Sequence, residues 1–326
     1  MQLSDSPIVG RRGSPWTGLK TVLAKETADH LSSLRMGILE ALVFLAALYA
    51  AILTTSQIRE TIGESPFLFL RLFTMTTDWL PLSLIAILGF LIPVVAIALA
   101  FDSINGEFNR RTLSRVLAQP IYRDALLLGK FLGALLSLSI ALLSLWLLVI
   151  GVGLLRLGLP PSTEEMVRML GFLVATIAYG GVWLALALLF SVLFRAPATA
   201  VLAALGTWLT LSLFWSIIAP IFASLIAGPP EGVLGPRLAY LNTEQIIDRL
   251  SPNTLYAETA LALLQPATRA LGPVLLSQLE GAVLGAPLPV TQSFVLIWPQ
   301  LTGLIAATIL IYAIAYVLFQ RQEIRA

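Results

Sequence analysis

The sequence of 326 residues contains no cysteine and only one histidine, His30. Without cysteine the chain can form no disulfide, no thiolate metal site and no cysteine nucleophile. A single histidine supplies neither a histidine-based metal cluster nor a catalytic triad of the Ser-His-Asp type. We therefore expect no metal site and no cofactor in this chain.

Charged residues are also scarce. They make up 12% of the chain, whereas a soluble domain carries about 25%. Hydrophobic residues make up 58%, and the mean hydropathy is +0.90. This composition predicts an all-α, polytopic membrane protein whose first partner is the lipid bilayer. The net charge of +2 is too small to indicate binding to nucleic acid, and the basic residues fall in loops, where topology explains them.

Sequence motifs for several enzyme classes are missing. The chain has no Gly-x-x-x-x-Gly-Lys-Ser/Thr phosphate loop, since Gly129-Lys130 lacks the upstream glycine and the hydroxyl, so we expect no ATP hydrolysis by this chain alone. It has no His-Glu-x-x-His and no Gly-x-Ser-x-Gly either. The apolar runs hold almost no ionisable residues, and Glu40 and Lys130 lie near their ends. Coupling to a proton or sodium gradient is therefore disfavoured.

Six apolar segments are each long enough to cross about 30 Å of hydrocarbon, which takes about 20 helical residues. We place them near 36–57, 80–101, 126–155, 169–194, 198–227 and 294–319. With the N-terminus inside, thirteen of the twenty Lys and Arg residues fall in inner segments and seven in outer ones. This excess predicts that both termini are cytoplasmic. The expected location is the plasma (inner) membrane of a bacterium or archaeon.

The loop 102–125 is polar and rich in arginine, and it separates the second and third apolar segments. Apolar residues in it are spaced as one face of a short helix: Ile104, Phe108, Leu113, Val116 and Leu117. Pro120 ends that helix. Two interpretations remain open at this point. The helix docks into a groove on a soluble partner, or the loop is only a positive segment that sets topology.

The same loop resembles the cytoplasmic loop of type-2 ABC exporter permeases. The resemblance is carried by Ile104-Asn105-Gly106-Glu107, Arg110, Thr112-Leu113, Gln119-Pro120, Arg123 and Leu128-Gly129-Lys130-Phe131. Arg111 departs from the pattern, because the family often has glycine there. The resemblance implies a coupling helix that contacts a separate ATPase subunit. The residues that it assigns to this contact are Glu107, Phe108, Arg110, Arg111 and Leu113, with Asp102 and Arg123 at the two ends.

The resemblance also implies the assembly: two ABC ATPase subunits that bind ATP and Mg, and a second permease copy or a paralogue. The N-terminal segment 16–35 resembles the family's amphipathic elbow helix at the membrane surface, with Trp16, Lys25, Glu26 and Asp29 as its interfacial residues. An ordinary charged flank before a span is the alternative.

Two further stretches are expected outside the bundle. The stretch 66–75 is too short to span and is expected to be an interfacial or outer-loop helix. Segment 228–292 is expected to be an extracytoplasmic loop with helices at 243–250, 254–264 and 272–283, which forms a surface cap. Its part 250–264 also resembles an outer loop of one branch of these permeases.

Within the spans, a cavity lined by Trp208, Phe214 and Trp215 would suit an apolar substrate, and Pro220 is a candidate hinge for that translocation path. The pairs Gly129/Gly133 and Gly180/Gly181 permit close approach of helices, for packing within the chain or for a dimer contact. The leading hypothesis is a permease subunit of an ATP-driven exporter. The alternatives are a structural or assembly subunit of a membrane complex and, third, a secondary transporter or channel.

Overall fold

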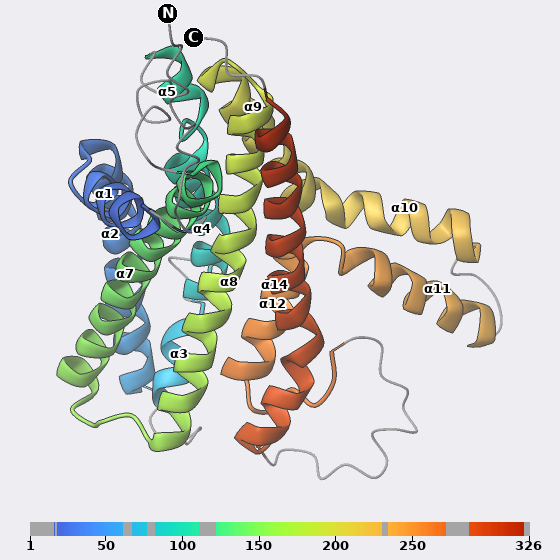
Figure 1. Cartoon of the computed structure of the whole chain (residues 1–326). Helices are drawn as coiled ribbons and strands as arrows, with labels where there is room; N and C mark the ends of the chain where they lie inside the picture. Colours follow the sequence, from blue (N-terminus) through green and yellow to red (C-terminus); the bar gives the residue numbers. More distant parts are fainter. Residues whose placement is uncertain are drawn as a thin grey trace, which may run out of the picture.

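The computed structural model describes residues 16, 18–60, 67–76, 82–110, 122–229, 234–271 and 287–322. Every regular element within these ranges is a helix, and six helical segments are long and apolar enough to cross a membrane (Figure 1). The predicted fold class is confirmed. The six candidate spans are Leu34–Ile58, Leu84–Asn109, Arg123–Leu157, Thr163–Leu193, Pro197–Ala227 and Val290–Arg321.

The main helices that form these spans are α2 (Leu34–Glu60), α4 (Leu84–Ala100), α7 (Arg123–Leu157), α8 (Thr163–Leu193), the helical series α9–η1–α10, and α14 (Val290–Arg321). Helix α8 begins earlier than the expected residue 169, because Ser162 forms a capping box. The Ser162 hydroxyl accepts a hydrogen bond from the Glu165 amide at 3.2 Å, and the Glu165 carboxylate accepts one from the Ser162 amide at 2.8 Å.

Helix α8 is the centre of the bundle and packs against α4, α7 and α14 (Figure 1). Its two adjacent glycines make these contacts close. A Cβ on Gly180 would lie 2.5 Å from Leu138 of α7, and a Cβ on Gly181 would lie 3.5 Å from Thr308 of α14. Of the two roles expected for this glycine pair, the structure shows helix packing within the chain.

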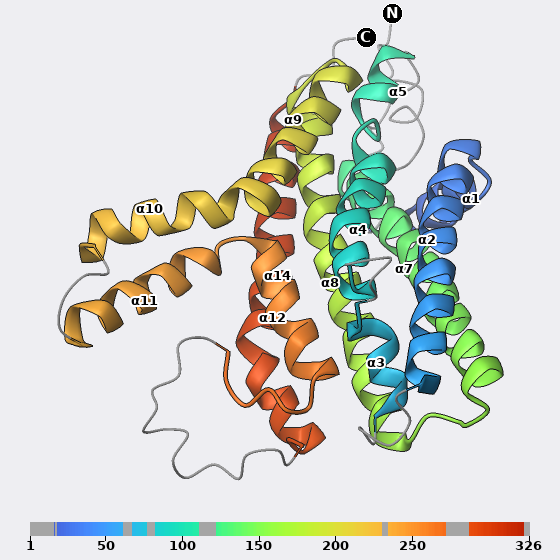
Figure 2. The same cartoon turned by 180° about the vertical axis from the view of Figure 1, so that it is seen from behind.

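Helix α12 (Pro252–Leu264) corrects the expected surface cap. It packs between α8 and α14 instead of lying over the end of the bundle (Figures 1 and 2). Tyr256 is 1% exposed and stacks on Tyr179 of α8, with 4.4 Å between ring centroids. Its N-terminal cap is Ser251, whose hydroxyl accepts from the Asn253 amide. The third expected helix, 272–283, lies outside the described residues.

Helix α3 (Leu68–Thr74) is also more deeply packed than an interfacial helix. Four of its side chains are buried: Phe69, Leu70, Leu72 and Phe73. Gly153 of α7 makes room for it, since a Cβ there would lie 2.7 Å from the Phe69 ring. The Phe69 amide donates to the Glu165 carboxylate at 2.8 Å, which ties α3 to the beginning of α8.

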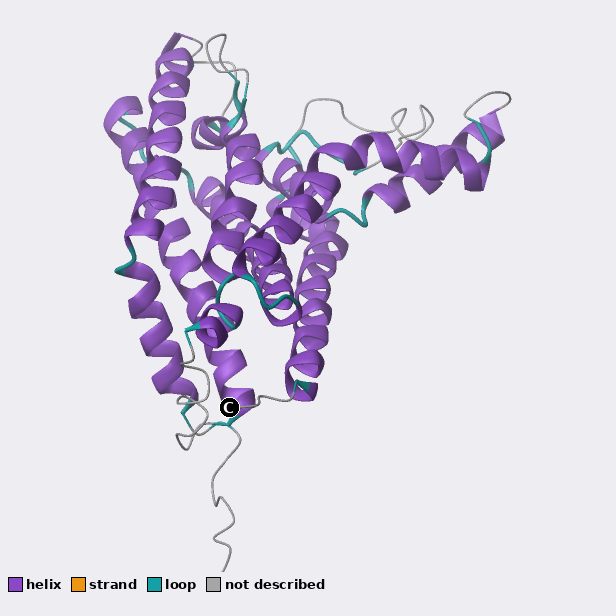
Figure 3. Cartoon of the chain, turned by 90° about the horizontal axis from the view of Figure 1, so that it is seen from above, coloured by secondary structure: helices purple, strands orange, loops and turns teal. Residues whose placement is uncertain are grey.

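The fifth candidate span is not one straight helix. It consists of α9 (Pro197–Leu209), a π-helical turn η1 (Thr210–Phe214) and α10 (Trp215–Ala227). Helix α10 turns away from the bundle, and α11 (Leu234–Asp248) returns beside it, so that the pair forms an arm that projects from the side of the molecule (Figures 1, 2 and 3). The expected helix 243–250 is thus the end of a longer one. The chain changes direction at η1, before Pro220, as expected of a π-type irregularity.

Candidate functional site

The ammonium group of Lys130 lies at the centre of an ion-pair cluster between three helices. Its Nζ donates to Glu26 Oε1 at 2.9 Å and to Glu107 Oε1 at 2.6 Å. Lys130 is 3% exposed, and it belongs to α7, whereas Glu26 lies on α1 (Leu19–Leu31) and Glu107 on α5 (Asn105–Asn109). One buried cation therefore joins the N-terminal helix, the loop helix and the third span.

Two glycines of α7 allow Glu26 to reach Lys130. A Cβ on Gly129 would lie 2.7 Å from Val22 of α1, and one on Gly133 would lie 2.8 Å from the Cβ of Glu26. Any larger side chain at these two positions would force α1 away from α7. The expected Gly129/Gly133 packing motif thus serves a contact within the chain, and this contact places the carboxylate of Glu26 beside the buried ammonium.

Helix α5 is fixed at the end of α8 by polar contacts. The Ser191 hydroxyl accepts from the amides of Ile104 and Asn105 at 3.0 and 3.3 Å. The Asn105 side chain donates to the Phe194 carbonyl at 3.2 Å, and the Asn109 side chain donates to the Arg195 carbonyl at 3.0 Å. Because α5 is only five residues long, these external contacts rather than its own hydrogen bonds hold it in place.

Further ion pairs surround the cluster. Arg35 forms a two-point pair with Asp102 at 3.1 and 3.3 Å, and its guanidinium lies 5.0 Å from the centre of the Phe101 ring. Lys25 pairs with Asp29 at 2.9 Å and with Glu26 at 3.1 Å. These side chains line an open polar cleft of about 180 Å³.

The titratable groups of α1 respond to this arrangement. Burial opposes ionisation of Glu26, but the charge and the hydrogen bond of Lys130 outweigh it, so the pKa of Glu26 lies below its ordinary 4.5. Burial lowers the pKa of His30 below its ordinary 6.5. At neutral pH the cluster therefore contains ionised Glu26 and neutral His30.

The residues assigned by resemblance to the ATPase contact lie in different surroundings. Glu107 points into the cluster, whereas Phe108 is 40% exposed, with the Arg195 guanidinium 5.9 Å from its ring centre. Asp102 and Arg110 line the polar cleft. Arg111 and Leu113 lie outside the described residues.

Arg123, at the far end of the loop, donates to the backbone carbonyls of Gln320 and Gln322. It therefore fixes the start of α7 to the end of α14.

Three of the four elbow residues are linked by ion pairs. Glu26 is buried at 8% exposure and pairs with Lys25, which also pairs with Asp29, whereas Trp16 is 57% exposed. The helix itself spans Leu19–Leu31, shorter than the expected 16–35, because the chain turns at Ser32 before α2 begins at Leu34.

The four residues predicted for a translocation path are spread along α9, η1 and α10. Trp208 is 4% exposed and packs edge-on against Phe90 of α4, with 4.9 Å between ring centroids. Trp215 donates its indole N–H to the Ile247 carbonyl at 3.1 Å, which closes the base of the arm. Phe214 is 53% exposed, and Pro220 lies within the arm. Their role in a translocation path stays a prediction.

Sequence reasoning missed two central residues. Lys130 looked like a terminal lysine of a span that reaches towards the interface, and only the adjacent Gly129/Gly133 pair signalled a close neighbour. Arg168 is one of the seven basic residues expected in outer segments, but it is fully buried. Its guanidinium donates to Glu164, Ser293 and the carbonyls of Leu263 and Leu288.

Comparison with known proteins agrees with this architecture. A family model described as ABC-2 family transporter protein matches residues 20–324. A protein of Stutzerimonas stutzeri named "Probable ABC transporter permease protein NosY" is 30% identical over 246 residues, which cover 74% of this chain and 79% of that protein. The protein with this name from Pseudomonas aeruginosa is 41% identical over 112 residues, or 32% of this chain and 38% of that protein. The chain therefore belongs to the ABC-2 family of transporter proteins and is an ABC transporter permease subunit.

Proposed function

We propose that this permease subunit exports its substrate and receives the energy of ATP hydrolysis through the loop 102–125. The observation that carries the proposal is the position of Lys130. Through Glu107 and Glu26, its buried ammonium links α5 of that loop to both α7 and the N-terminal helix α1. A force applied to α5 by an ATPase subunit would reach the bundle through these contacts.

The surface that contacts the ATPase in this proposal is the exposed part of the loop. Phe108 is an apolar ring at 40% exposure on a short helix whose other contacts are polar. A soluble partner with an apolar pocket would bury it, as aromatic anchors are buried at protein interfaces. ATP and Mg would bind to that partner. We propose two such ATPase subunits, one for each permease, and cytoplasmic termini in a plasma membrane.

The test is co-purification from the native membrane. Wild-type protein should retain an ABC ATPase subunit, and Phe108→Asp should lose at least about nine-tenths of it, because truncating or charging a central anchor costs about 2 kcal/mol or more. Leu159→Asp is the matched control, since Leu159 is 57% exposed in the loop between α7 and α8, at the other end of both helices. It should retain the ATPase fully.

Two results would contradict this assignment. If Phe108→Asp retains the ATPase fully, the ATPase contact does not lie on α5. If wild-type protein retains no ATPase under conditions that preserve membrane complexes, the role of a structural or assembly subunit would take first place.

A second copy of the permease is part of the same proposal. Arg237, Leu241, Glu244 and Asp248 are spaced as one stripe along α11 of the projecting arm. Two such helices placed antiparallel about a two-fold axis near Leu241 would set Arg237 of each against Glu244 of the other. Because the chain has no cysteine, Leu241→Cys introduces a single thiol. It should form a disulfide-linked dimer in membranes, whereas Leu159→Cys should not.

A further inference from the structure

An open groove lies between the first turns of α7 and the second half of α14. Its space measures about 350 Å³, which is within the range of about 300–1,000 Å³ for pockets that hold small molecules. One lining residue is charged, and the others are aromatic or aliphatic: Trp16, Asp124, Leu128, Ile309, Tyr312, Ala313 and Tyr316. None of them belongs to the cluster around Lys130 or to the arm, so the groove is a separate feature of the bundle.

The carboxylate of Asp124 is held in place by neutral donors. Its Oδ1 accepts from the Tyr316 hydroxyl at 3.0 Å and from the side-chain amide of Gln320, both on α14. None of the ion pairs within the described ranges includes Asp124. The adjacent Arg123 donates instead to the backbone carbonyls of Gln320 and Gln322. The groove therefore presents a fixed carboxylate that is open to pairing with a cation.

The charged end of the groove lies near the helix ends, and its aliphatic part lies deeper. Asp124 is the second residue of α7, and Tyr316 is five residues, or about 8 Å, before the end of α14 at Arg321. Ile309 is about 18 Å from that end. Trp and Tyr side chains are typical of the membrane interface, where head groups lie. A molecule that matches both parts has its charge at head-group level and its hydrocarbon deeper, as a bilayer lipid does.

The polar atoms of the groove select the head group. The Asp124 carboxylate accepts hydrogen bonds, and the phenol oxygens of Tyr312 and Tyr316 can accept them as well. A primary ammonium group has three N–H donors and no acceptor, and aromatic rings attract a cation that lies over their faces. A head group with a net negative charge would instead be repelled by the carboxylate. The groove therefore fits an amine better than an anionic head group.

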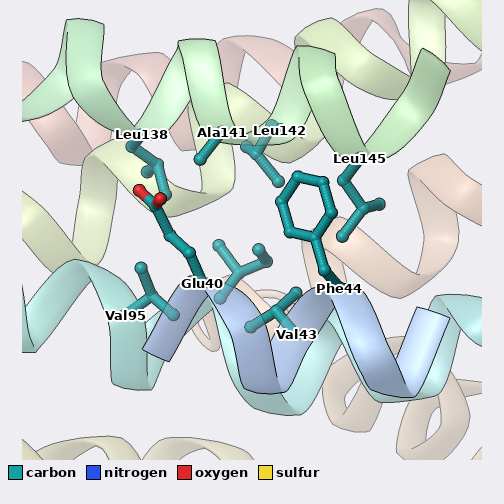
Figure 4. Close-up of a pocket in the computed structure, with 9 residues that line it drawn as sticks. Glu40, Val43, Phe44, Val95, Leu138, Ala141, Leu142 and Leu145 are labelled. Atoms are coloured by element: carbon teal, nitrogen blue, oxygen red, sulfur yellow. The ribbon is translucent and has the colours of Figure 1, made fainter. Parts of the chain in front are cut away.

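A second carboxylate shows that charge alone does not make such a site. Figure 4 shows Glu40 of α2 among apolar side chains that include Phe44 and Leu142. Only about 20 Å³ is open there, which is room for about one water molecule. No head group fits beside Glu40. This residue therefore provides a matched control, a carboxylate in apolar surroundings without space for a lipid.

We propose that the groove between α7 and α14 binds one phospholipid with a primary ammonium head group, phosphatidylethanolamine. The ammonium group pairs with the Asp124 carboxylate beside the rings of Trp16 and Tyr312, and one acyl chain lies along Leu128 and Ile309. The site belongs to one permease chain and needs no ATPase. It is therefore independent of the energy coupling proposed above, and either proposal can fail without the other.

The test uses the full chain in nanodiscs with equal amounts of phosphatidylethanolamine and phosphatidylglycerol that have identical acyl chains. Native mass spectrometry measures the lipid that each released chain retains. The wild type should retain about tenfold more phosphatidylethanolamine, which corresponds to one charge-assisted hydrogen bond, although the net charge of +2 by itself favours the anionic lipid. Phosphatidylcholine, whose nitrogen has no N–H, should be retained less than phosphatidylethanolamine.

Variants and a photoreactive lipid locate the site. Asp124→Asn should lower the retention ratio about tenfold, to near 1, whereas Glu40→Gln should leave the ratio unchanged. Phosphatidylethanolamine with a diazirine near the carbonyl end of one acyl chain should form adducts at Leu128 or Ile309. Ala313→Trp fills the groove without changing its charge and should remove these adducts. Melting curves establish that each variant is folded.

Four results would each overturn the proposal. The first is an unchanged retention ratio in folded Asp124→Asn, and the second is an equal loss of the ratio in Glu40→Gln. The third is retention of phosphatidylcholine as strong as that of phosphatidylethanolamine, because the site would then not recognise N–H donors. The fourth is the formation of adducts only on helices other than α7 and α14.

Discussion

Replacement of Lys130 by methionine tests the cluster most directly. The change keeps most of the side-chain volume but removes the ammonium that holds Glu26 and Glu107 together. Both carboxylates accept from one nitrogen, so they lie close to each other and would repel once the ammonium is lost. Removing one partner of a buried ion pair costs about 3–5 kcal/mol. The Glu107 side chain is 19% exposed, so water screens part of its uncompensated charge. We therefore expect the free energy of unfolding to fall by about 3 kcal/mol.

The free energy of unfolding is measured by denaturant titration of the detergent-solubilised protein. Lys20→Met is the matched control, since Lys20 lies exposed on α1. It should change the free energy of unfolding by less than about 0.5 kcal/mol. The triple variant Lys130→Met/Glu26→Gln/Glu107→Gln removes the charge imbalance and should regain most of the stability, because a neutral replacement of a buried ion pair is often tolerated.

Either of two results would refute this reasoning. If Lys130→Met is as stable as the wild type, the three side chains do not form a desolvated cluster. If the triple variant is no more stable than Lys130→Met, the loss comes from packing of the lysine side chain and not from uncompensated charge.

Three further predictions use single substitutions. Gly133→Leu should destabilise the protein by about 2 kcal/mol through its clash with α1, whereas Gly151→Leu should be neutral, because nothing lies within 4 Å of a Cβ there; equal effects would contradict the packing argument. Arg168→Met should cost about 3 kcal/mol in chemical unfolding, since it leaves the Leu263 and Leu288 carbonyls without their donor. His30→Gln should flatten the pH dependence of unfolding below about pH 6.5, where the unfolded chain takes up a proton that buried His30 resists.

The sign of the pH effect follows from the direction of each shift. The pKa of His30 is lowered by burial, so the unfolded state binds more protons as the pH falls below 6.5 and stability declines. The pKa of Glu26 is also lowered, so its stabilisation is full above 4.5 and is lost only as the pH falls further. The two windows are therefore separate, and His30→Gln should affect only the upper one.

The six spans were predictable because each depends on a local property, an apolar run of about 20 residues. A helix at 254–264 was predicted as well, but the burial of α12 in the bundle was not, because its 13 residues are too few to span a membrane. Its burial depends on Tyr256 meeting Tyr179 of another helix. The direction of α10 was not predictable either. Its composition is that of a span, and the π-helical turn η1 redirects it.

The cluster around Lys130 shows the same limit. Glu26 and Lys130 are 104 residues apart in the chain, and nothing in the local pattern at either position indicates the other. Resemblance placed Glu26 in the elbow helix and Glu107 in the coupling helix, two separate assignments. Only the close approach of α1 to Gly129 and Gly133 brings both carboxylates to one ammonium.

These contacts determine how a movement of α5 would spread. Its beginning is bonded to Ser191 of α8, and Glu107 within it is bonded to Lys130 of α7. If α5 moved alone, two backbone amides would lose their acceptor and the buried ammonium would lose Glu107, one of its two carboxylates, and each loss costs about 1–3 kcal/mol. Movement of α7 and α8 together with α5 keeps all of these bonds. A push on α5 would therefore displace the adjoining ends of α7 and α8 as one unit, which is what coupling through this loop requires.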